Sequence, residues 1–315
     1  MTMQLIRGVQ NLPADWPGAA LTIGNFDGIH RGHQALIAAT GRWARRLNLP
    51  LTVLCFEPTP REYFAPVAAP GRISTLRSKL RDFADAGVDA VVIQRFGPPF
   101  CALSGTEFID RIVHGNLRAQ AVVVGDDFVF GAKRSGNLVL LQERGAALGF
   151  AAEGLGSVCL NELRFSSTAL REALAQADLA QAERLLNRPY RVLGRIVRGL
   201  QLGRQLQMPT ANINLRRRPA LRLGVYAVRA RLSGDARCWR GVASIGVRPT
   251  LGITRCLLEA HLFDDPGDIY GRLLDVEFRH FLRAEERFDS LAELQVQMHR
   301  DKADAMAFLA SEPDN

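Results

Sequence analysis

His30 and His33 stand three residues apart in a glycine-rich stretch, residues 24–33. An apolar run, residues 20–23, precedes this stretch, and an amphipathic run with helical spacing follows it. This order predicts a strand, a tight turn and the start of a helix, whose unpaired N–H groups attract phosphate. Two imidazoles beside a helix start can donate hydrogen bonds to a phosphate that gains charge during a reaction. A glycine turn with two surface histidines is the alternative that this motif alone leaves open.

Two further segments of unusual composition also follow strand-like runs. Residues 56–60 read F-E-P-T-P, and residues 125–131 read G-D-D-F-V-F-G. From residue 20 to about residue 186, strand-like and helix-like runs alternate, which is typical of a doubly wound, Rossmann-like parallel sheet covered by helices. Ligands bind outside the carboxyl ends of the strands in such sheets. We therefore expect these two segments and residues 24–33 to lie on one rim and to share a site.

A hydroxyl-rich helix start closes this half of the chain. Arg164 precedes the sequence S-S-T, which includes Ser167 and Thr168, and Arg171 follows one turn later. Hydroxyls before an apolar run are suited first of all to cap a helix, and this structural role is a strong explanation for them. Two guanidinium groups beside hydroxyls are also suited to clamp a phosphate. The residues leave both interpretations open.

The stretch G-N-F-D-G-I-H-R-G-H at residues 24–33 resembles the motif of nucleotidyltransferases that adenylylate small phosphorylated substrates, here the bacterial bifunctional riboflavin kinase/FAD synthetase family. S-S-T-A-L-R resembles the phosphate-gripping motif of that family, and G-D-D-F-V-F-G resembles its segment near the flavin and the nucleotide. Thr59 departs from the family pattern, which often has histidine there. The resemblance implies that the catalytic residues are His30, His33 and Arg171, that Asp127 and Phe128 contact the flavin, and that ATP contacts Gly24, Phe26, Asp27, Gly32, Arg164, Ser167 and Thr168.

The second half of the chain is richer in strand-like runs. They cover residues 190–197, 225–232, 241–247, 257–263 and 273–281. Residues 291–309 have helical spacing, and Ser290 with Glu293 has the spacing of a capping box. Many strands followed by one helix predict a small antiparallel β-barrel closed by a C-terminal helix. The composition changes near residues 187–189, so we expect two domains, residues 1–186 and residues 187–315.

Residues 203–212, which read G-R-Q-L-Q-M-P-T-A-N, contain two candidate oxygen ligands. In an extended segment Thr210 and Asn212 point to the same side, and neutral oxygens together with the phosphates of a nucleotide suit Mg²⁺. From the residues alone, a turn with two polar surface residues is the simpler interpretation. The stretch resembles the riboflavin kinase motif G-R-x-L-G-F-P-T-A-N, which implies that ATP contacts Gly203, Arg204 and Pro209 and that Mg²⁺ is held by Thr210 and Asn212.

A carboxylate in an apolar strand is the candidate catalyst of the second half. Glu259 lies among leucines, where a carboxylate is unusual, and a structural ion pair is the alternative explanation. The segment L-E-A-H-L-F resembles the strand that carries the catalytic glutamate of riboflavin kinases, and F-L-R-A-E, with Arg283 as an implied flavin contact, continues the pattern. Gln207, Met208 and Ser244 depart from the pattern, which has glycine, phenylalanine and asparagine there.

The composition is that of an ordinary globular protein. The 315 residues carry a net charge of +8, but the arginines are spread along the chain without a basic stripe, which disfavours nucleic-acid binding. No signal peptide or membrane-spanning run is evident, and the 5 cysteines form no C-x-x-C pair. We expect a cytoplasmic protein with reduced thiols and with no membrane or nucleic-acid partner, and we leave oligomerisation open.

The resemblance implies two successive reactions with ATP as co-substrate. The C-terminal domain phosphorylates riboflavin to FMN with Mg²⁺, and the N-terminal domain adenylylates FMN to FAD with release of pyrophosphate. The sequence has no G-x-x-x-x-G-K-[ST] loop, so the kinase is not of the P-loop kind. We expect two separate phosphate-binding pockets, one on the sheet rim and one at the barrel mouth. Two alternatives remain: a nucleotidyltransferase for another phosphorylated acceptor with a non-catalytic barrel, and a non-enzymatic binder of flavin or nucleic acid.

Overall fold

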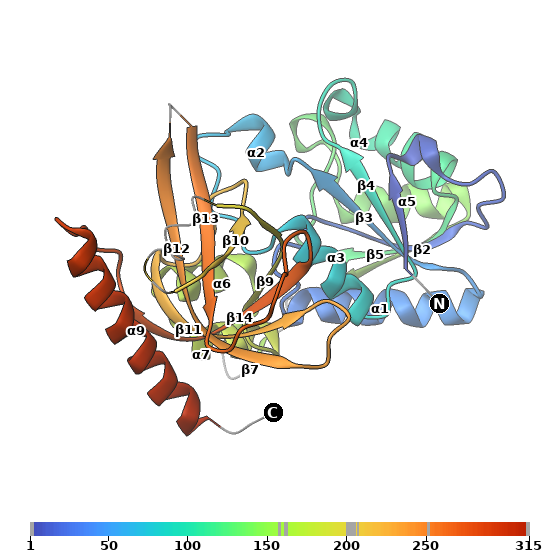
Figure 1. Ribbon diagram of the computed structural model, residues 1–315. Coiled ribbons are helices and arrows are strands. Elements are labelled where there is room, and N and C mark those ends of the chain that lie inside the picture. Colours follow the sequence, from blue (N-terminus) through green and yellow to red (C-terminus); the bar gives the residue numbers. More distant parts are fainter. Residues whose placement is uncertain are drawn as a thin grey trace. The chain divides into compact units, whose positions relative to one another are not determined.

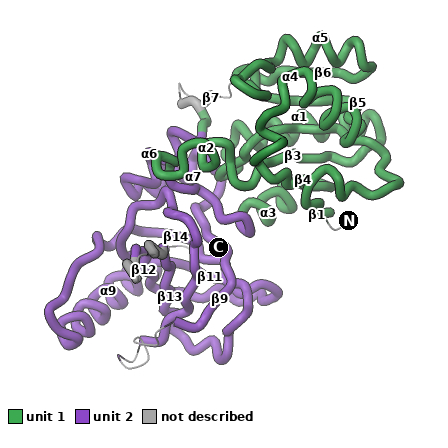
Figure 2. Tube along the Cα trace, turned by 90° about the horizontal axis from the view of Figure 1, so that it is seen from above, with its two compact units in different colours: residues 1–70, 79–166 green, residues 71–78, 167–315 purple. Residues whose placement is uncertain are grey.

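The computed structural model describes residues 3–156, 159–160, 163–199, 206, 208–250 and 253–312. Contacts between Cα atoms divide the chain into two compact units, which Figure 2 colours separately. We call residues 1–70 with 79–166 the sheet unit, and residues 71–78 with 167–315 the barrel unit. The predicted boundary between residues 186 and 187 concerns functional domains rather than contacts, and it stays a prediction.

The sheet unit contains a 6-stranded parallel sheet. Its strands are β1 (Gln4–Arg7), β2 (Ala19–Ile23), β3 (Leu51–Glu57), β4 (Ala90–Arg95), β5 (Ala119–Gly125) and β6 (Ala151–Leu155). They lie in the order β1-β4-β3-β2-β5-β6, and all neighbours pair in parallel (Figure 1). The strand order reverses at β2, which has β3 on one side and β5 on the other, and open α/β sheets bind ligands at such a point. The predicted Rossmann-like sheet is confirmed.

Helices and short helical turns alternate with these strands along the chain. They are α1 (Arg31–Leu47), α2 (Pro60–Phe64), α3 (Leu76–Asp85), α4 (Gly105–Glu107) and α5 (Leu138–Leu148), with η1 (Val9–Asn11), η2 (Phe100–Ala102), η3 (Phe108–Asn116) and η4 (Ala132–Arg134). The short pair β7 (Cys159–Leu160) and β8 (Leu163–Arg164) follows β6. The capping box of α4 is complete, because the Ser104 hydroxyl accepts a bond from the N–H of Glu107 and the Glu107 carboxylate accepts one from the N–H of Ser104.

The barrel unit contains a closed antiparallel barrel in the order β10-β13-β12-β11-β14-β9. Its strands are β9 (Arg191–Val197), β10 (Ala211–Asn214), β11 (Gly224–Leu232), β12 (Cys238–Thr250), β13 (Ile253–Leu262) and β14 (Leu273–Arg283). Tyr226 and Phe278 meet edge to face inside it, with ring centroids 5.2 Å apart, and both side chains are buried. The predicted barrel is confirmed.

Three helices belong to the barrel unit: α6 (Ser167–Ala175), α7 (Leu179–Leu186) and α9 (Leu291–Ser311). The C-terminal helix α9 packs on the outside of β11, β12 and β14 (Figure 1). The buried cluster under it includes Ala305 and Leu309 of α9 with Val225, Ala227 and Val242 of the barrel. Ser290 caps α9 as predicted, accepting a bond from the N–H of Glu293, but the Glu293 carboxylate bonds the N–H of Asp289.

Two strands of the parallel sheet, β1 and β6, were not predicted from the sequence. Both are edge strands. One residue of β1 is buried and all of β6 is half-buried, so neither contains the continuous apolar run of a central parallel strand. Gly154 inside β6 further weakens the sequence pattern.

Candidate active sites

The turn after β2 brings His30 and His33 together at the start of α1. Their imidazole rings are stacked, with centroids 3.8 Å apart and an angle of 22° between the ring planes. His30 is the N-cap residue of α1 and is 5% exposed, and the first turn of α1 has no acidic residue. Two imidazoles therefore lie beside the positive end of a helix dipole, which favours a bound anion.

Aromatic packing fixes the shape of this turn. Phe26 adopts a positive φ of 47° and is buried, with its ring centroid 5.0 Å from that of His33 and 5.4 Å from that of Phe83 in α3. A Cβ at Gly32 would stand 3.0 Å from the carbonyl oxygen of Phe165, so the glycine permits a close approach of two backbone segments. Aromatic packing and this close approach therefore help to hold the turn in its shape.

A buried lysine lies under the same turn. Lys79 of α3 is 2% exposed, and its Nζ donates a hydrogen bond of 2.7 Å to the carbonyl oxygen of Asn25. A buried ammonium group is costly unless it is hydrogen-bonded or close to negative charge. Asp27, a predicted ATP contact, is buried in this turn as well. The bond from Lys79 therefore ties α3 to the turn.

The segments that follow β3 and β5 lie at the same edge of the sheet, because β2, β3 and β5 are parallel neighbours. Thr59 caps α2, since its Oγ1 accepts a bond from the N–H of Glu62 and the Glu62 carboxylate accepts one from the N–H of Thr59. Threonine therefore has a structural role where the family pattern often has histidine. After β5, Asp127 is exposed, and Phe128 is half-buried and stacks on Phe130 with centroids 5.3 Å apart.

A series of aromatic rings follows this edge of the sheet. Each ring contacts the next with centroid distances of 5.2 to 6.0 Å. The series contains Tyr63, Phe64, Phe96, Phe56, Phe100, Phe108, Phe130 and Phe128. Phe64 is 68% exposed, so the series reaches the surface. Flat apolar faces of this kind suit the ring system of a planar ligand.

The hydroxyl-rich helix start belongs to the barrel unit. Ser167 and Thr168 are the first residues of α6. The guanidinium of Arg171 donates from Nε to the carbonyl of Gly71 at 3.0 Å and from Nη1 to the carbonyl of Ser167 at 3.3 Å. Arg171 therefore stabilises local backbone, and its predicted phosphate contact stays a prediction. The side chain of Arg164 lies outside the described part of the chain.

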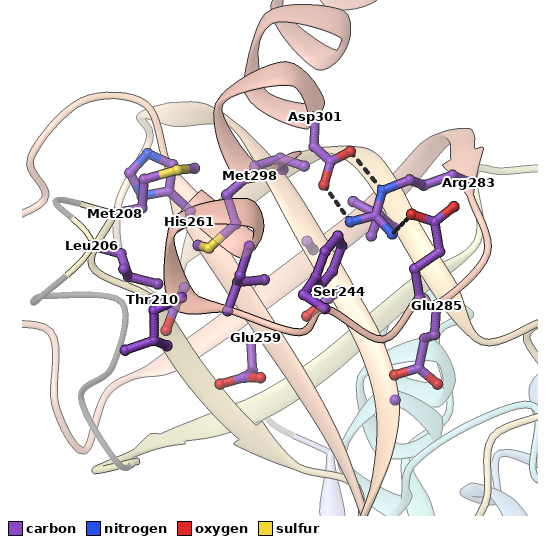
Figure 3. Close-up of a pocket in the computed structure, with 18 of the residues that line it drawn as sticks. Leu206, Met208, Thr210, Ser244, Glu259, His261, Arg283, Glu285, Met298 and Asp301 are labelled. Atoms are coloured by element: carbon purple, nitrogen blue, oxygen red, sulfur yellow. Dashed lines mark hydrogen bonds and ion pairs between the residues drawn. The ribbon is translucent and has the colours of Figure 1, made fainter. Parts of the chain in front are cut away.

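A cavity of about 590 Å³ lies in the barrel unit between the barrel wall and α9 (Figure 3). Along β13, Leu257, Glu259 and His261 line the cavity, whereas the intervening Leu258 and Ala260 are buried. Side chains alternate between the faces of a strand, so the cavity is on the outer face of the barrel. The cavity lies where α9 covers the outer wall, and the expectation of a phosphate-binding pocket at the barrel mouth stays a prediction.

Strand register aligns five residues in one row along this outer face. Asn212 of β10 pairs with Glu259 of β13, and Glu259 pairs with Ser244 of β12. Ser244 pairs with Val225 of β11, and Val225 pairs with Arg283 of β14. Directly opposite residues share a face with Cβ atoms about 4.5–5.5 Å apart. The candidate catalytic carboxylate and a candidate metal ligand are therefore immediate neighbours.

The oxygen atoms of Thr210 and Asn212 fit a hard cation. Asn212 is 5% exposed, its Nδ2 donates to the carbonyl of Thr210 at 3.2 Å, and its buried Oδ1 has no hydrogen-bond partner among the described residues. A Cβ at Gly199 would stand 2.7 Å from the Asn212 amide, so glycine leaves room for this side chain. Within the described ranges, no group of 3 or more His, Cys, Asp or Glu side chains could hold a metal ion. A cation here would rely on neutral oxygens and on ligand phosphates.

An ion pair closes the other side of the cavity by tying α9 to β14 (Figure 3). Arg283 donates from Nε and Nη2 to the two oxygens of Asp301, at 2.8 and 2.7 Å. Gln297 donates to the same carboxylate at 2.9 Å, and Asp301 is 4% exposed. The bonds to Asp301 raise the pKa of the Arg283 guanidinium. Arg283 lines the cavity with its guanidinium already engaged, and its predicted contact with flavin stays a prediction.

The predicted loop before β10 is only partly described. Gly203 and Arg204 lie outside the described residues. The carbonyl oxygen of Pro209 is 2.9 Å from Nδ1 of His261. Met208, which stands where the family pattern has phenylalanine, is buried in the cluster under α9. An apolar side chain is thus retained there.

Sequence reasoning missed Lys79, His261 and Asp301. The sequence contains a feature that indicates each of them, but that feature points to one role only when the fold is known. Asp301 is a carboxylate at helical spacing between the apolar Met298 and Ala305, which indicates a buried ion pair. His261 lies two residues after Glu259 and hence on the same strand face, and Lys79 is one of the few lysines in an arginine-rich chain.

The chain matches known proteins along its length. The family model for FAD synthetase matches residues 12–169, and the model for riboflavin kinase matches residues 186–309. The bifunctional riboflavin kinase/FMN adenylyltransferase of Haemophilus influenzae is 45% identical over 309 residues, which cover 98% of this chain and 100% of the relative. This chain belongs to the bifunctional riboflavin kinase/FMN adenylyltransferase family.

Further proteins and a solved structure are similar to this chain. Proteins of the same name from Escherichia coli K12 and Pseudomonas fluorescens are 47% and 46% identical, covering 97% and 98% of this chain and 98% of each relative. A solved structure described as a macrolide-efflux protein from Streptococcus pneumoniae has a TM-score of 0.74 and 26% identity, covering 96% of this chain and 97% of that one. In the described ranges of this chain, no helix has both the length and the apolar character needed to cross a membrane.

Proposed function

We propose that this chain converts riboflavin to FMN and FMN to FAD, with ATP as co-substrate of both steps. Residues 1–186 carry the adenylyl transfer and residues 187–315 carry the phosphorylation, in agreement with the two matched family models. The observation that carries the kinase assignment is the strand register, which makes Glu259 the cross-strand neighbour of Asn212 on the wall that lines the cavity.

In the kinase site, the terminal ribityl hydroxyl of riboflavin forms a bond to the γ-phosphorus of ATP, and the bond from that phosphorus to the β,γ-bridging oxygen breaks. Glu259 orients the hydroxyl and accepts its proton late in the transfer, because a carboxylate is much less basic than an alkoxide. Thr210 and Asn212 would hold Mg²⁺, which when bound neutralises charge on the phosphates. Positioning by the cavity walls provides most of the rate.

In the adenylyl-transfer site, a phosphate oxygen of FMN forms a bond to the α-phosphorus of ATP. The bond from that phosphorus to the pyrophosphate oxygen breaks, and pyrophosphate leaves with the electron pair. The FMN phosphate is already ionised at neutral pH, so no strong general base is needed. His30 and His33 donate hydrogen bonds to the charge that develops on the phosphates.

The aromatic series along the sheet edge supports binding of FMN at the adenylyl-transfer site. The half-buried Phe128 and the exposed Phe64 belong to this series, so aromatic faces are accessible next to the segment that contains Asp127. The flat isoalloxazine ring of FMN can stack on such faces. We assign the flavin end of FMN to this part of the sheet edge.

The experiment that tests this function is a time course with separation of flavins. The purified chain is incubated with riboflavin, ATP and Mg²⁺, and we expect FMN to appear first and FAD to follow. Incubation with FMN and ATP should give FAD and pyrophosphate directly. A chain that forms FAD from FMN but never phosphorylates riboflavin has only the nucleotidyltransferase activity, and a chain that forms neither product refutes the proposal.

A further inference from the structure

His261 is buried beside the proposed kinase site without a role in the chemistry described above. It lies two residues after Glu259 in β13, lines the same cavity and is 5% exposed. Its Nδ1 is 2.9 Å from the carbonyl oxygen of Pro209, the residue immediately before Thr210. The ring therefore connects the strand of the candidate catalyst to the segment of the candidate metal ligands.

The contact with Pro209 shows which nitrogen of the His261 ring carries a hydrogen. A carbonyl oxygen only accepts hydrogen bonds, so Nδ1 carries the hydrogen in this contact. Nε2 is buried and has no hydrogen-bond partner among the described residues. Burial lowers the pKa of His261, the hydrogen bond to Pro209 raises it, and the nearby Lys302 on α9 lowers it, with a net shift below the ordinary value. The ring is therefore neutral at pH 7, with one hydrogen bond, through Nδ1.

The hydrogen bond from His261 to Pro209 lies just before the start of the ladder between β10 and β13. The pairing of β10 with β13 begins at Ala211, which lies opposite Ala260. Pro209, two residues earlier, has no N–H group with which to extend a ladder. Its carbonyl oxygen is bonded by the His261 side chain instead. The bond therefore adds a contact with β13 immediately before Thr210.

We propose that His261 is a positioning residue of the kinase site, which fixes Thr210 relative to Glu259 by holding the carbonyl oxygen of Pro209. This inference rests on the proposed function. It assigns His261 no contact with substrate and no proton transfer. Its effect reaches the reaction through the placement of Thr210, while the strand ladder places Asn212 beside the carboxylate.

Three substitutions separate the possible roles of the ring. In His261→Asn, the side-chain amide nitrogen takes the place of Nδ1 and can still donate to Pro209. In His261→Gln, the amide nitrogen takes the place of Nε2, and His261→Phe keeps an aromatic ring without any nitrogen. The measurements are the kinetics of FMN formation, calorimetric binding of ADP with and without Mg²⁺, and the FMN-to-FAD rate of the same protein as internal control.

We expect His261→Phe to weaken Mg²⁺-dependent ADP binding and FMN formation by about 10- to 100-fold, the range found for groups that orient metal ligands. ADP binding without Mg²⁺ and the FMN-to-FAD rate should stay close to those of the unmodified chain. His261→Asn should restore most of the loss, and His261→Gln should not. If the Phe protein does not fold, the comparison of Asn with Gln still decides, because both carry an amide.

Two results would overturn the inference: Mg²⁺-dependent binding unchanged in His261→Phe, or rescue by Gln rather than Asn, which would assign the role to Nε2. Equal losses in ADP binding with and without Mg²⁺ would also contradict it, because that result describes general damage to the cavity. If the unmodified chain phosphorylates riboflavin and the His261→Phe protein does so equally well, only this inference is refuted. An unmodified chain that makes no FMN refutes the proposed kinase function itself.

Discussion

The ion pair between Arg283 and Asp301 should contribute much more to the barrel unit than an ion pair of the same length at its surface. Its side chains are 18% and 6% exposed, and the shortest contact is 2.7 Å. Removing one partner of a buried pair leaves an uncompensated charge and typically costs about 3–5 kcal/mol. Glu286, 3.8 Å from Arg283 and 55% exposed, compensates little. We expect Asp301→Leu to lower the free energy of unfolding by roughly 3 kcal/mol.

The same barrel unit contains a matched control. Arg237 and Asp264 form an ion pair at 2.8 Å, but their side chains are 52% and 71% exposed. Exposed pairs contribute about 0.2–1 kcal/mol, because water screens them. Asp264→Leu should therefore change the free energy of unfolding by less than about 1 kcal/mol. The contrast between the two substitutions isolates burial, since the two distances are nearly equal.

The free energy of unfolding is measured by urea unfolding for each single variant and for the double variant Arg283→Met/Asp301→Leu. The affinity for riboflavin is measured for the same proteins. The double variant should regain most of the stability lost by Asp301→Leu, because no unpaired charge remains. Riboflavin binding should weaken in Asp301→Leu, since the pair ties α9 to the wall of the cavity. Equal costs for Asp301→Leu and Asp264→Leu would refute this reasoning.

Three further predictions concern the sheet unit. Lys79→Met should slow FMN-to-FAD conversion by about 10- to 100-fold with FMN formation unchanged, because the Asn25 carbonyl loses its donor and the phosphate-binding turn shifts; equal rates of FAD formation would contradict it. Thr59→Ala removes the cap of α2 and should destabilise the unit by about 1 kcal/mol in urea unfolding, whereas Thr59→Ser should not. Burial raises the pKa of Cys55 to about 11. The contribution of the neutral thiol to the stability of the unit is therefore fully present below the pKa of an unfolded thiol and is lost as the pH rises toward 11. Iodoacetamide at pH 8.5 should therefore modify the partly exposed Cys101 in the native state and Cys55 only after unfolding.

The architecture could be predicted because it follows from local patterns in the chain. Apolar runs such as residues 20–23 gave the central strands, and the spacing of Ser290 to Glu293 gave the start of α9. The edge strand β1 could not be predicted, because one buried residue in four produces no pattern. Parallel pairing of β2, β3 and β5 then placed the three unusual segments on one edge, as expected.

The candidate site of the barrel could be predicted only in part. Glu259 and Asn212 are far apart in sequence, and register alone makes them neighbours. The position of the cavity on the outer wall depends on α9, whose docking is a tertiary contact between residues far apart in the chain. The bond from His261 to Pro209 likewise joins a side chain to a backbone oxygen 52 positions away, which no spacing rule encodes.

The central claim is that the two activities use separate sites, one at Glu259 and one at His30 and His33. The most direct measurement compares Glu259→Gln and His33→Ala by following both reactions in each protein. Glu259→Gln should lose FMN formation and keep FMN-to-FAD conversion, whereas His33→Ala should keep the first and lose the second by about 100-fold or more. Parallel loss of both reactions in either protein would contradict the claim.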